Sequence, residues 1–217
     1  MNLGEKKPLV IGVCIVAIVI SILSLFITQC ESSPKIDVSR YAAAAEGLGK
    51  KLGQELPDGS KVVLVSMDPK IESQVFSAQM EGFDKGFAPF TSKIEIVERY
   101  NIKLEDMSRG TGSGMPTKVY TDVLQKHPNV DVIASLVGIP LLSDEEIDQL
   151  PANIPKLYAM ILYDIGVKRA FDEGILSAAV IPKYEKIDEG SDPKDAEALF
   201  NKYYRYVTEA DYESLTF

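Results

Sequence analysis

The sequence predicts an α/β protein, with a doubly wound parallel sheet of five strands in the flavodoxin-like order 2-1-3-4-5, preceded by one N-terminal transmembrane helix. Two observations predict this class. Residues 8–28 carry no charged side chain, and after them five short apolar runs alternate with helical patterns of apolar residues. Because strand–helix–strand crossovers are right-handed, few other topologies fit this alternation.

The N-terminal apolar segment is long enough to span a membrane. As a helix, residues 8–28 extend about 31 Å, close to the roughly 30 Å of a bilayer's hydrocarbon core. Lys6 and Lys7 precede it, so the positive-inside rule makes residues 1–7 a cytoplasmic tail and places the rest outside the cytoplasm. We therefore expect a single-pass cell-membrane protein whose C-terminal domain is periplasmic.

Two other fates of this segment stay open. Cys30 directly after it resembles the lipidated cysteine of a bacterial lipoprotein, although Gln29 before it is not small. Cleavage as a secretory signal is the other alternative. A retained signal-anchor at 8–28 is the prediction, with residues 29–38 as a polar tether and residues 39–217 as the extracytoplasmic domain.

The first half of the domain contains two predicted strands and two predicted helices. Apolar residues three and four apart predict a helix over 41–52. The run 62–65 follows a Pro-Asp-Gly turn and is continuously apolar, as in strands buried on both faces. A helix over 71–87 and a strand over 94–97 follow.

The second half repeats the alternation. After the glycine-rich loop 109–114 we expect helix 116–124, strand 132–137, helix 146–150, strand 157–162, helix 167–171, strand 175–181 and a last helix 193–207. Ser143 and Glu146 have the spacing of a capping box. Asp192 is the expected cap of the last helix, and Tyr203 and Val207 belong to its inner face.

Composition excludes several function classes. The chain has 23 basic against 32 acidic residues, a net charge of −9, which disfavours binding to nucleic acid. Both cysteines lie in residues 1–30, so the domain has no internal disulfide. With a single histidine and no metal-loop spacing among the acidic residues 185–197, we expect neither a bound metal nor a cofactor.

The sequence offers little to an enzyme. His127 lies between Lys126 and Pro128 at a helix end, where it is expected to contact the final carbonyl groups rather than act as a base. Asp144-Glu145-Glu146 fits a helix's first turn, where acidic residues complement the helix dipole. The loop 109–114 lacks the Lys-Ser/Thr pair of a phosphate-binding loop. We predict that the protein is not an enzyme.

Three sequence phrases resemble the type I periplasmic sugar-binding proteins, and specifically their C-terminal lobe. They are Gln79-Met80-Glu81-Gly82-Phe83-Asp84-Lys85-Gly86-Phe87, the stretch 123–133 (Val-Leu-Gln-Lys-His-Pro-Asn-Val-Asp-Val-Ile), and Asp164 followed ten residues later by Gly174-Ile175-Leu176-Ser177-Ala178-Ala179-Val180. The helix before strand 62–65 also fits the segment leading into that lobe. The resemblance covers about residues 39–187.

The resemblance implies binding of a sugar or related solute at the carboxyl ends of the strands. Matched by motif position, the implied ligand contacts are Ser66, Asp68, Gly138 and Asp164, with Asp164 the best of them because a carboxylate there accepts sugar hydroxyl hydrogen bonds. Too few residues precede the first strand to form the family's other lobe, so a partner protein or a second copy would have to complete the cleft.

Departures from the family pattern favour an alternative. Gly138-Ile139-Pro140 stands where the family often has a polar pair, and Ile181-Pro182-Lys183 where it often has Gln. The first hypothesis is a membrane-anchored solute-binding module. The alternative is a degenerate lobe that serves as a protein–protein interaction domain in an envelope complex, without ligand.

Overall fold

The computed structural model describes residues 37–107, 114–163, 165–183 and 191–213. The predicted tail, the predicted transmembrane segment 8–28 and most of the predicted tether lie outside these residues. None of the helices that are described combines the length and the apolar character needed to cross a bilayer. The elements below all belong to one compact unit, Val38–Phe217.

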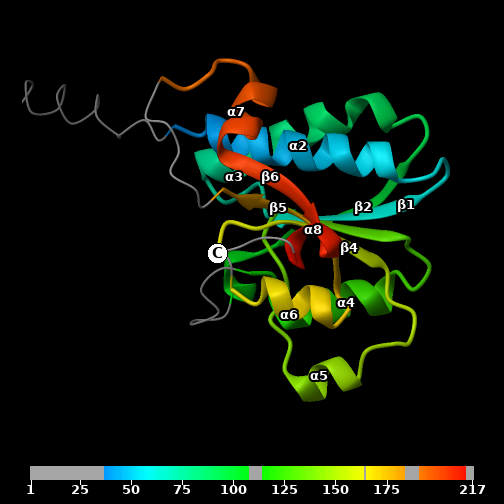
Figure 1. Ribbon diagram of the computed structural model, residues 1–217. Helices are drawn as coiled ribbons and strands as arrows, with labels where there is room; N and C mark the ends of the chain where they lie inside the picture. Colours follow the sequence, from blue (N-terminus) through cyan, green and yellow to red (C-terminus); the bar gives the residue numbers. More distant parts are fainter. Residues whose placement is uncertain (1–36, 108–113, 164, 184–190, 214–217) are drawn as a thin grey trace, which may run out of the picture. The chain divides into compact units, whose positions relative to one another are not determined.

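The centre of the domain is a mixed sheet of six strands (Figure 1). Its order is β2-β1-β3-β4-β5-β6, and the first five strands are parallel, in the order that the sequence predicted. The strands are β1 (Lys61–Met67), β2 (Glu95–Ile102), β3 (Val132–Ser135), β4 (Lys156–Met160), β5 (Leu176–Pro182) and β6 (Tyr204–Thr208).

Helices cover both faces of the sheet, as Figure 1 shows. On one face lie α2 (Ser39–Glu55), α3 (Gln74–Phe87) and α7 (Ala196–Tyr203). On the other lie α4 (Thr117–Lys126), α5 (Asp144–Asp148), α6 (Val167–Asp172) and α8 (Glu209–Glu213). Two short 3-10 turns, η1 (Ala88–Phe90) and η2 (Leu104–Asp106), flank β2. The doubly wound class predicted from the sequence is confirmed.

Strand β1 shows why the core needs both helical layers. Val62 and Leu64 belong to the apolar cluster beneath α2 and α3, whereas Val63 and Val65 belong to the cluster beneath α4 and α6. All four are fully buried. Because side chains alternate between the faces of a strand, a continuous apolar run is stable only where both faces are covered.

The prediction of five strands and of a helix extending to Val207 was wrong. Helix α7 ends at Tyr203, and the next five residues form β6, which pairs antiparallel with β5. Tyr204 and Tyr206 pack on the α2 side, and Val207 packs on the opposite side. This is the period of two that a strand requires, and tyrosine and valine favour strands.

Glycines allow α2 and α3 to pack closely. A Cβ atom on Gly82 would lie 2.2 Å from the carbonyl oxygen of Ala42, and one on Gly86 would lie 2.1 Å from that of Glu46. Gly82 and Gly86 are four residues apart on α3, and their contacts Ala42 and Glu46 are four residues apart on α2. One row of positions on α3 therefore faces one row on α2. The phrase 79–87 that carries the family resemblance therefore contains the contact surface of this helix pair.

Two predicted helix caps had different outcomes. The capping box of Ser143 and Glu146 at α5 is confirmed, with both reciprocal hydrogen bonds present. Asp192 does not cap α7. Asp195 does so, accepting a hydrogen bond of 2.9 Å from the backbone N–H of Ala198. Asp192 has other partners, described below.

Candidate functional site at the carboxyl edge of the sheet

The carboxyl ends of the parallel strands meet at one edge of the sheet, which we call the carboxyl edge. Val65 near the end of β1 pairs with Ser135 of β3, which pairs in turn with Ala159 of β4. The loops that leave these strands therefore lie next to one another. In open parallel sheets this is where ligands bind, so the predicted contact residues can be placed here.

Ser66 is turned away from the surface. Its side chain lies in β1 and is 1% exposed, and its hydroxyl donates a hydrogen bond of 3.2 Å to Oδ1 of Asn101 in β2. A hydroxyl has one proton to donate, and Ser66 donates it to Asn101 of the neighbouring strand. This hydrogen bond ties β1 to β2. Ser66 has a structural role in this arrangement.

Asp68 lies directly after β1 and remains partly exposed. Its Oδ1 accepts a hydrogen bond of 2.9 Å from the backbone N–H of Lys70, and its own N–H donates to the carbonyl of Ile102 at 2.8 Å. The side chain thus orders the loop after β1. Ser66, Asp68 and Gly138 are the described predicted contacts, and of these three only Asp68 presents a carboxylate at the carboxyl edge.

Gly138 shapes the loop after β3 from within. It is buried and has a φ angle of 89°, a left-handed conformation that favours glycine. Its carbonyl oxygen accepts a hydrogen bond of 2.6 Å from the hydroxyl of buried Ser135. This bond holds the turn that carries the chain from β3 to the following residues.

Asp164 lies outside the described residues, so the best of the predicted contacts has no described position. The residues on either side of it are described. Tyr163 and Ile165 are each 60% exposed, although both are large and apolar or aromatic. They belong to the loop between β4 and α6.

Large exposed apolar or aromatic side chains occur in the loops that leave β3 and β4 at the carboxyl edge, and the sequence alone did not single them out. Leu141, after β3, is 45% exposed, and its Cδ2 lies 2.8 Å from where a Cβ atom on Gly166 would stand. The loops after β3 and β4 are therefore in contact. We call Leu141, Tyr163 and Ile165 the carboxyl-edge patch. Leu104, after β2, is 68% exposed beyond it.

A sequence signal for this patch was present but incomplete. The stretch Leu136-Val137-Gly138-Ile139-Pro140-Leu141-Leu142 is apolar beyond the end of β3. Periodicity does not show that Leu142 is buried and Leu141 exposed. That difference depends on how the loop folds over α4, where the Thr117 hydroxyl donates to the Leu141 carbonyl at 3.4 Å.

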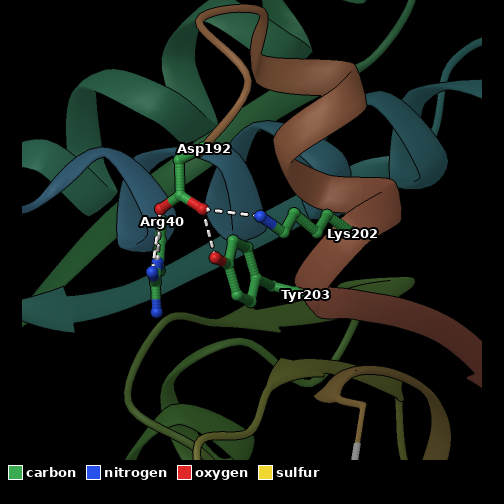
Figure 2. Close-up of polar contacts among 4 residues, drawn as sticks. All are labelled: Arg40, Asp192, Lys202 and Tyr203. Carbon is green, nitrogen blue, oxygen red and sulfur yellow. Dashed lines mark hydrogen bonds and ion pairs between the residues drawn. The ribbon is translucent and has the colours of Figure 1, made fainter. Parts of the chain in front are cut away.

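A second polar cluster surrounds Asp192, where the β5–α7 connection meets α2 (Figure 2). Oδ2 of Asp192 accepts hydrogen bonds from Nε and Nη2 of Arg40, at 3.1 and 2.8 Å. Oδ1 accepts from Nζ of Lys202 at 3.1 Å and from the hydroxyl of Tyr203. The Arg40 guanidinium also lies over the Tyr203 ring, 3.9 Å from its centroid.

These donors stabilise the ionised carboxylate of Asp192. Hydrogen bonds from the Tyr203 hydroxyl and from Arg40 hold the pKa of Asp192 well below its usual range. The backbone N–H of Lys183, just after β5, donates to the Tyr203 carbonyl at 2.8 Å. The Asp192 cluster therefore joins the first turn of α2, the end of α7 and the chain that leaves β5.

His127 has a structural partner that the sequence analysis did not identify. Its Nε2 contacts Oε2 of Glu98 in β2, and Lys126 pairs with the other oxygen of Glu98 at 2.6 Å. The Lys126 ammonium, with a smaller effect of His127, holds the pKa of Glu98 below its ordinary value. The expected contact with helix-end carbonyls is replaced by a link between α4 and β2.

Among the described residues, the acidic side chains considered in the sequence do not form a metal-binding or catalytic group. Asp144, Glu145 and Glu146 form the first turn of α5, and Asp144 pairs with Arg169. No three His, Cys, Asp or Glu side chains among the described residues are grouped so that they could hold a metal ion. The predicted loop 109–114 lies largely outside the described residues.

Three surface grooves are lined by described residues, and none of the three includes Ser66, Asp68 or Gly138. One lies between α2 and α7, where Lys50 and Glu197 form an ion pair of 2.8 Å. A second lies between α4 and α5, and a third follows the outer edge of β2. None of these three grooves brings the predicted ligand contacts together.

Comparison with known proteins supports the fold. No protein-family model and no curated protein matches the sequence. A solute-binding protein of an ABC transporter from Burkholderia graminis, solved in complex with D-arabinose, is 15% identical with a TM-score of 0.52, and the match covers 81% of this chain and 62% of that one. A sugar-binding protein of a Bacillus halodurans sugar ABC transporter is 14% identical with a TM-score of 0.52, and the match covers 80% of this chain and 63% of that one.

A third similar structure is described as an XylFII–LytSN complex, at 12% identity and a TM-score of 0.51, covering 79% of this chain and 60% of that one. The chain thus spans about three-fifths of the length of the solved structures it matches, which is consistent with a single lobe. The resemblance found in the sequence is confirmed at the level of fold: this domain has the fold of the sugar-binding, solute-binding proteins of ABC transporters.

Proposed function

We propose that the protein is a membrane-anchored, extracytoplasmic interaction module that contacts another protein through the carboxyl edge of its sheet. The observation that carries this proposal is the carboxyl-edge patch: Leu141, Tyr163 and Ile165 are about half exposed, while Ser66 and Gly138 are buried. Exposed apolar patches on soluble domains mark interaction sites.

The chemistry of the edge favours a protein over a sugar. Sugar recognition needs several directed polar groups, because each buried hydroxyl left without a partner costs about 1–3 kcal/mol. The Ser66 hydroxyl is engaged by Asn101, and the Gly138 carbonyl is engaged by Ser135. An apolar surface of another protein gains free energy by covering the carboxyl-edge patch without needing such groups.

The proposed setting follows from the N-terminal sequence. Residues 8–28 would anchor the chain in the cell membrane, and Lys6 and Lys7 would keep residues 1–7 in the cytoplasm. The domain would then meet its partner outside the cytoplasm. A reporter fused at residue 217 should be active only in its periplasmic form, and activity of a cytoplasmic reporter there would contradict the proposed orientation.

Photo-crosslinking in native membranes tests the docking face. A photoreactive phenylalanine analogue at Tyr163 should form a defined crosslinked product with another polypeptide. The same analogue at Lys93, which is exposed before β2 at the opposite edge of the sheet, should not. Equal products from both positions, or none from Tyr163, would contradict the proposal.

A second function, solute binding in a cleft completed by a partner, is favoured by one observation. Asp68 keeps a partly exposed carboxylate at the carboxyl edge, on a fold shared with a protein solved with D-arabinose. In this proposal Asp68 and Asp164 accept hydrogen bonds from the ligand, and Ser66 and Gly138 hold the loops around it.

Calorimetry separates the two functions. The full chain in detergent would be titrated with a panel of pentoses and hexoses. Binding that is lost in both Asp68→Asn and Asp164→Asn would establish the second function, whereas no heat from any sugar would leave the first. Asp58→Asn, an exposed carboxylate in the turn before β1 at the opposite edge of the sheet, is the matched control.

A further inference from the structure

We infer that Arg40, Lys202 and Tyr203 form a carboxylate-binding site, which Asp192 occupies from within the chain until a carboxylate from outside replaces it. Figure 2 shows the three donors converging on the Asp192 carboxylate. The site itself does not depend on the proposed function. Only the source of the outside carboxylate, an acidic side chain of the docked partner, rests on that function.

The donors match the two oxygens of a carboxylate. Arg40 donates to one oxygen of Asp192 through Nε and Nη2, at 3.1 and 2.8 Å. The Lys202 ammonium, at 3.1 Å, and the Tyr203 hydroxyl donate to the other oxygen. Hydrogen bonds between charged groups are stronger than those between neutral ones. Because each oxygen has its own donors, the arrangement suits a planar group with two oxygens.

Contacts that do not involve Asp192 hold the donors in place. The Arg40 guanidinium lies over the Tyr203 ring, 3.9 Å from its centroid, and the Lys202 ammonium lies 5.2 Å from the same centroid. Such cation–π contacts are favourable. The Tyr203 carbonyl also accepts the Lys183 N–H at 2.8 Å, which fixes the end of α7 against the chain leaving β5. The donors are thus preorganised, and this lowers the cost of binding.

Asp192 itself is separable from the elements that carry its donors. It lies in a segment without regular structure, whereas the donors belong to helices α2 and α7. Asp195 caps α7, so the start of this helix does not depend on Asp192. The side chains of Arg40 and Asp192 are 45% and 24% exposed, so solvent reaches the site. Replacing Asp192 therefore requires neither unwinding of a helix nor opening of the core.

The site lies beside the carboxyl edge, because Tyr204, directly after Tyr203, pairs with Pro182 at the end of β5. A partner docked on this edge would bring an acidic side chain within reach. Exchange of one carboxylate for another keeps the number of hydrogen bonds the same, so it gains little free energy by itself. A free carboxylate must also compete with the high effective concentration of Asp192 in its own chain. The partner's other contacts would therefore drive the exchange.

Chemical rescue of the full chain in detergent tests the site. Asp192→Ala removes the carboxyl group and keeps Cβ, so formate has the size of the missing group. Sodium formate should raise the melting temperature of this variant saturably, above sodium chloride at equal ionic strength. Wild type, whose site is occupied, should show no such rise. Glu197→Ala, which removes the carboxylate of the exposed ion pair with Lys50 on the same two helices, is the matched control and should show none.

Three outcomes would overturn the site. The first is no rise in Asp192→Ala, or no recovery of its folding with formate if the variant is unfolded without it. The second is a rise that persists in the double variant Asp192→Ala, Arg40→Met, because formate would then act elsewhere. The third is a larger rise with phosphate than with formate at equal ionic strength, which would overturn the carboxylate as the ligand class.

Photo-crosslinking in native membranes separates the exchange from the proposed function. With the photoreactive analogue at Tyr163, Asp192→Ala should increase the yield of the crosslinked product at least twofold, because no internal carboxylate competes with that of the partner. Arg40→Met should lower the yield severalfold. A product whose yield neither variant changes would overturn the exchange and leave the docking face intact. No product from Tyr163 in wild type would contradict the proposed function, and formate rescue would still decide the site.

Discussion

The α2 side of the domain and the carboxyl edge of its sheet use their side chains in opposite ways. On the α2 side, Gly82 and Gly86 bring two helices into backbone contact, and the Asp192 carboxylate accepts hydrogen bonds on both oxygens. At the carboxyl edge, Tyr163 and Ile165 are exposed and Asp68 is only partly engaged.

This difference separates structural from functional demands. A region whose polar groups have partners and whose helices touch has little free energy to gain from another molecule. A region that leaves large apolar side chains in water gains free energy when something covers them. The contrast predicts that changes on the α2 side reduce stability, and that changes at the carboxyl edge reduce association.

The largest effect is expected for Gly86→Ala. The added Cβ would lie 2.1 Å from the Glu46 carbonyl oxygen, which belongs to helix backbone and cannot move without separating α2 from α3. Overpacking of this kind costs about 1–3 kcal/mol, and we expect the upper end because the obstacle is backbone. Urea unfolding of the domain measures it. Gly59→Ala, where a Cβ would have no neighbour within 4 Å, is the control for close approach, with a cost from its φ of 88° alone.

The next effect is expected for Asp192→Asn. The asparagine amide would turn N–H groups toward the donors around it, and it would lose the negative charge that attracts Arg40 and Lys202. The melting temperature at pH 7 should therefore fall. Because the pKa of Asp192 is lowered in the folded state, its contribution is complete above the unfolded pKa of about 3.9 and is lost as the pH falls below it.

Thermal melts over a pH series check this sign. The difference in melting temperature between wild type and Asp192→Asn should be largest near neutral pH and should become smaller below about pH 4. Asp144→Asn, on an exposed ion pair, should show little gap at any pH. A gap that widens in acid would mean that the Asp192 cluster does not stabilise the ionised carboxylate.

A smaller effect of opposite sign is expected for Tyr120→Phe. The Tyr120 hydroxyl is fully buried in the core beneath α4 and has no hydrogen-bond partner among the residues that the structure describes, and burial raises its pKa to about 12. Removing an unsatisfied buried hydroxyl should leave stability unchanged or increase it by up to about 1 kcal/mol. Urea unfolding is the measurement, and a loss above 1 kcal/mol would reveal a partner for this hydroxyl, such as a buried water.

The sequence was sufficient for the architecture because the relevant signals are local. The run Val62–Val65 needs two covered faces wherever it lies, and the alternation of such runs with helical patterns leaves few topologies. Strand β6 was not predicted, because the spacing of Leu199, Phe200, Tyr203 and Val207 also fits a helix, while Tyr204, Tyr206 and Val207 fit a strand. Pairing with β5 decided between the two periods.

The site was harder to predict because its properties depend on distant partners. Asp192 looked like a helix cap from its neighbours, yet its partner Arg40 lies 152 residues away. Ser66 matched a ligand position, and its hydroxyl points instead to Asn101 of the neighbouring strand. Exposure of Tyr163 and Ile165 is likewise a property of the assembled edge. No spacing rule along the chain contains this information.

The smallest effect on stability at each site, and the sharpest test of the contrast, is expected for the triple variant Leu141→Ser, Tyr163→Ser, Ile165→Ser. These side chains are about half exposed, so their loss should change the free energy of unfolding by only about 0.5 kcal/mol per site. Crosslinking from a nearby probe position should nevertheless disappear, because the contact has lost its apolar surface. The matched control is a triple serine variant of Lys93, Glu81 and Glu95, which are exposed away from the carboxyl edge. If the patch variant unfolded as readily as Gly86→Ala, the patch would be part of the core, and the distinction between the two regions would fail.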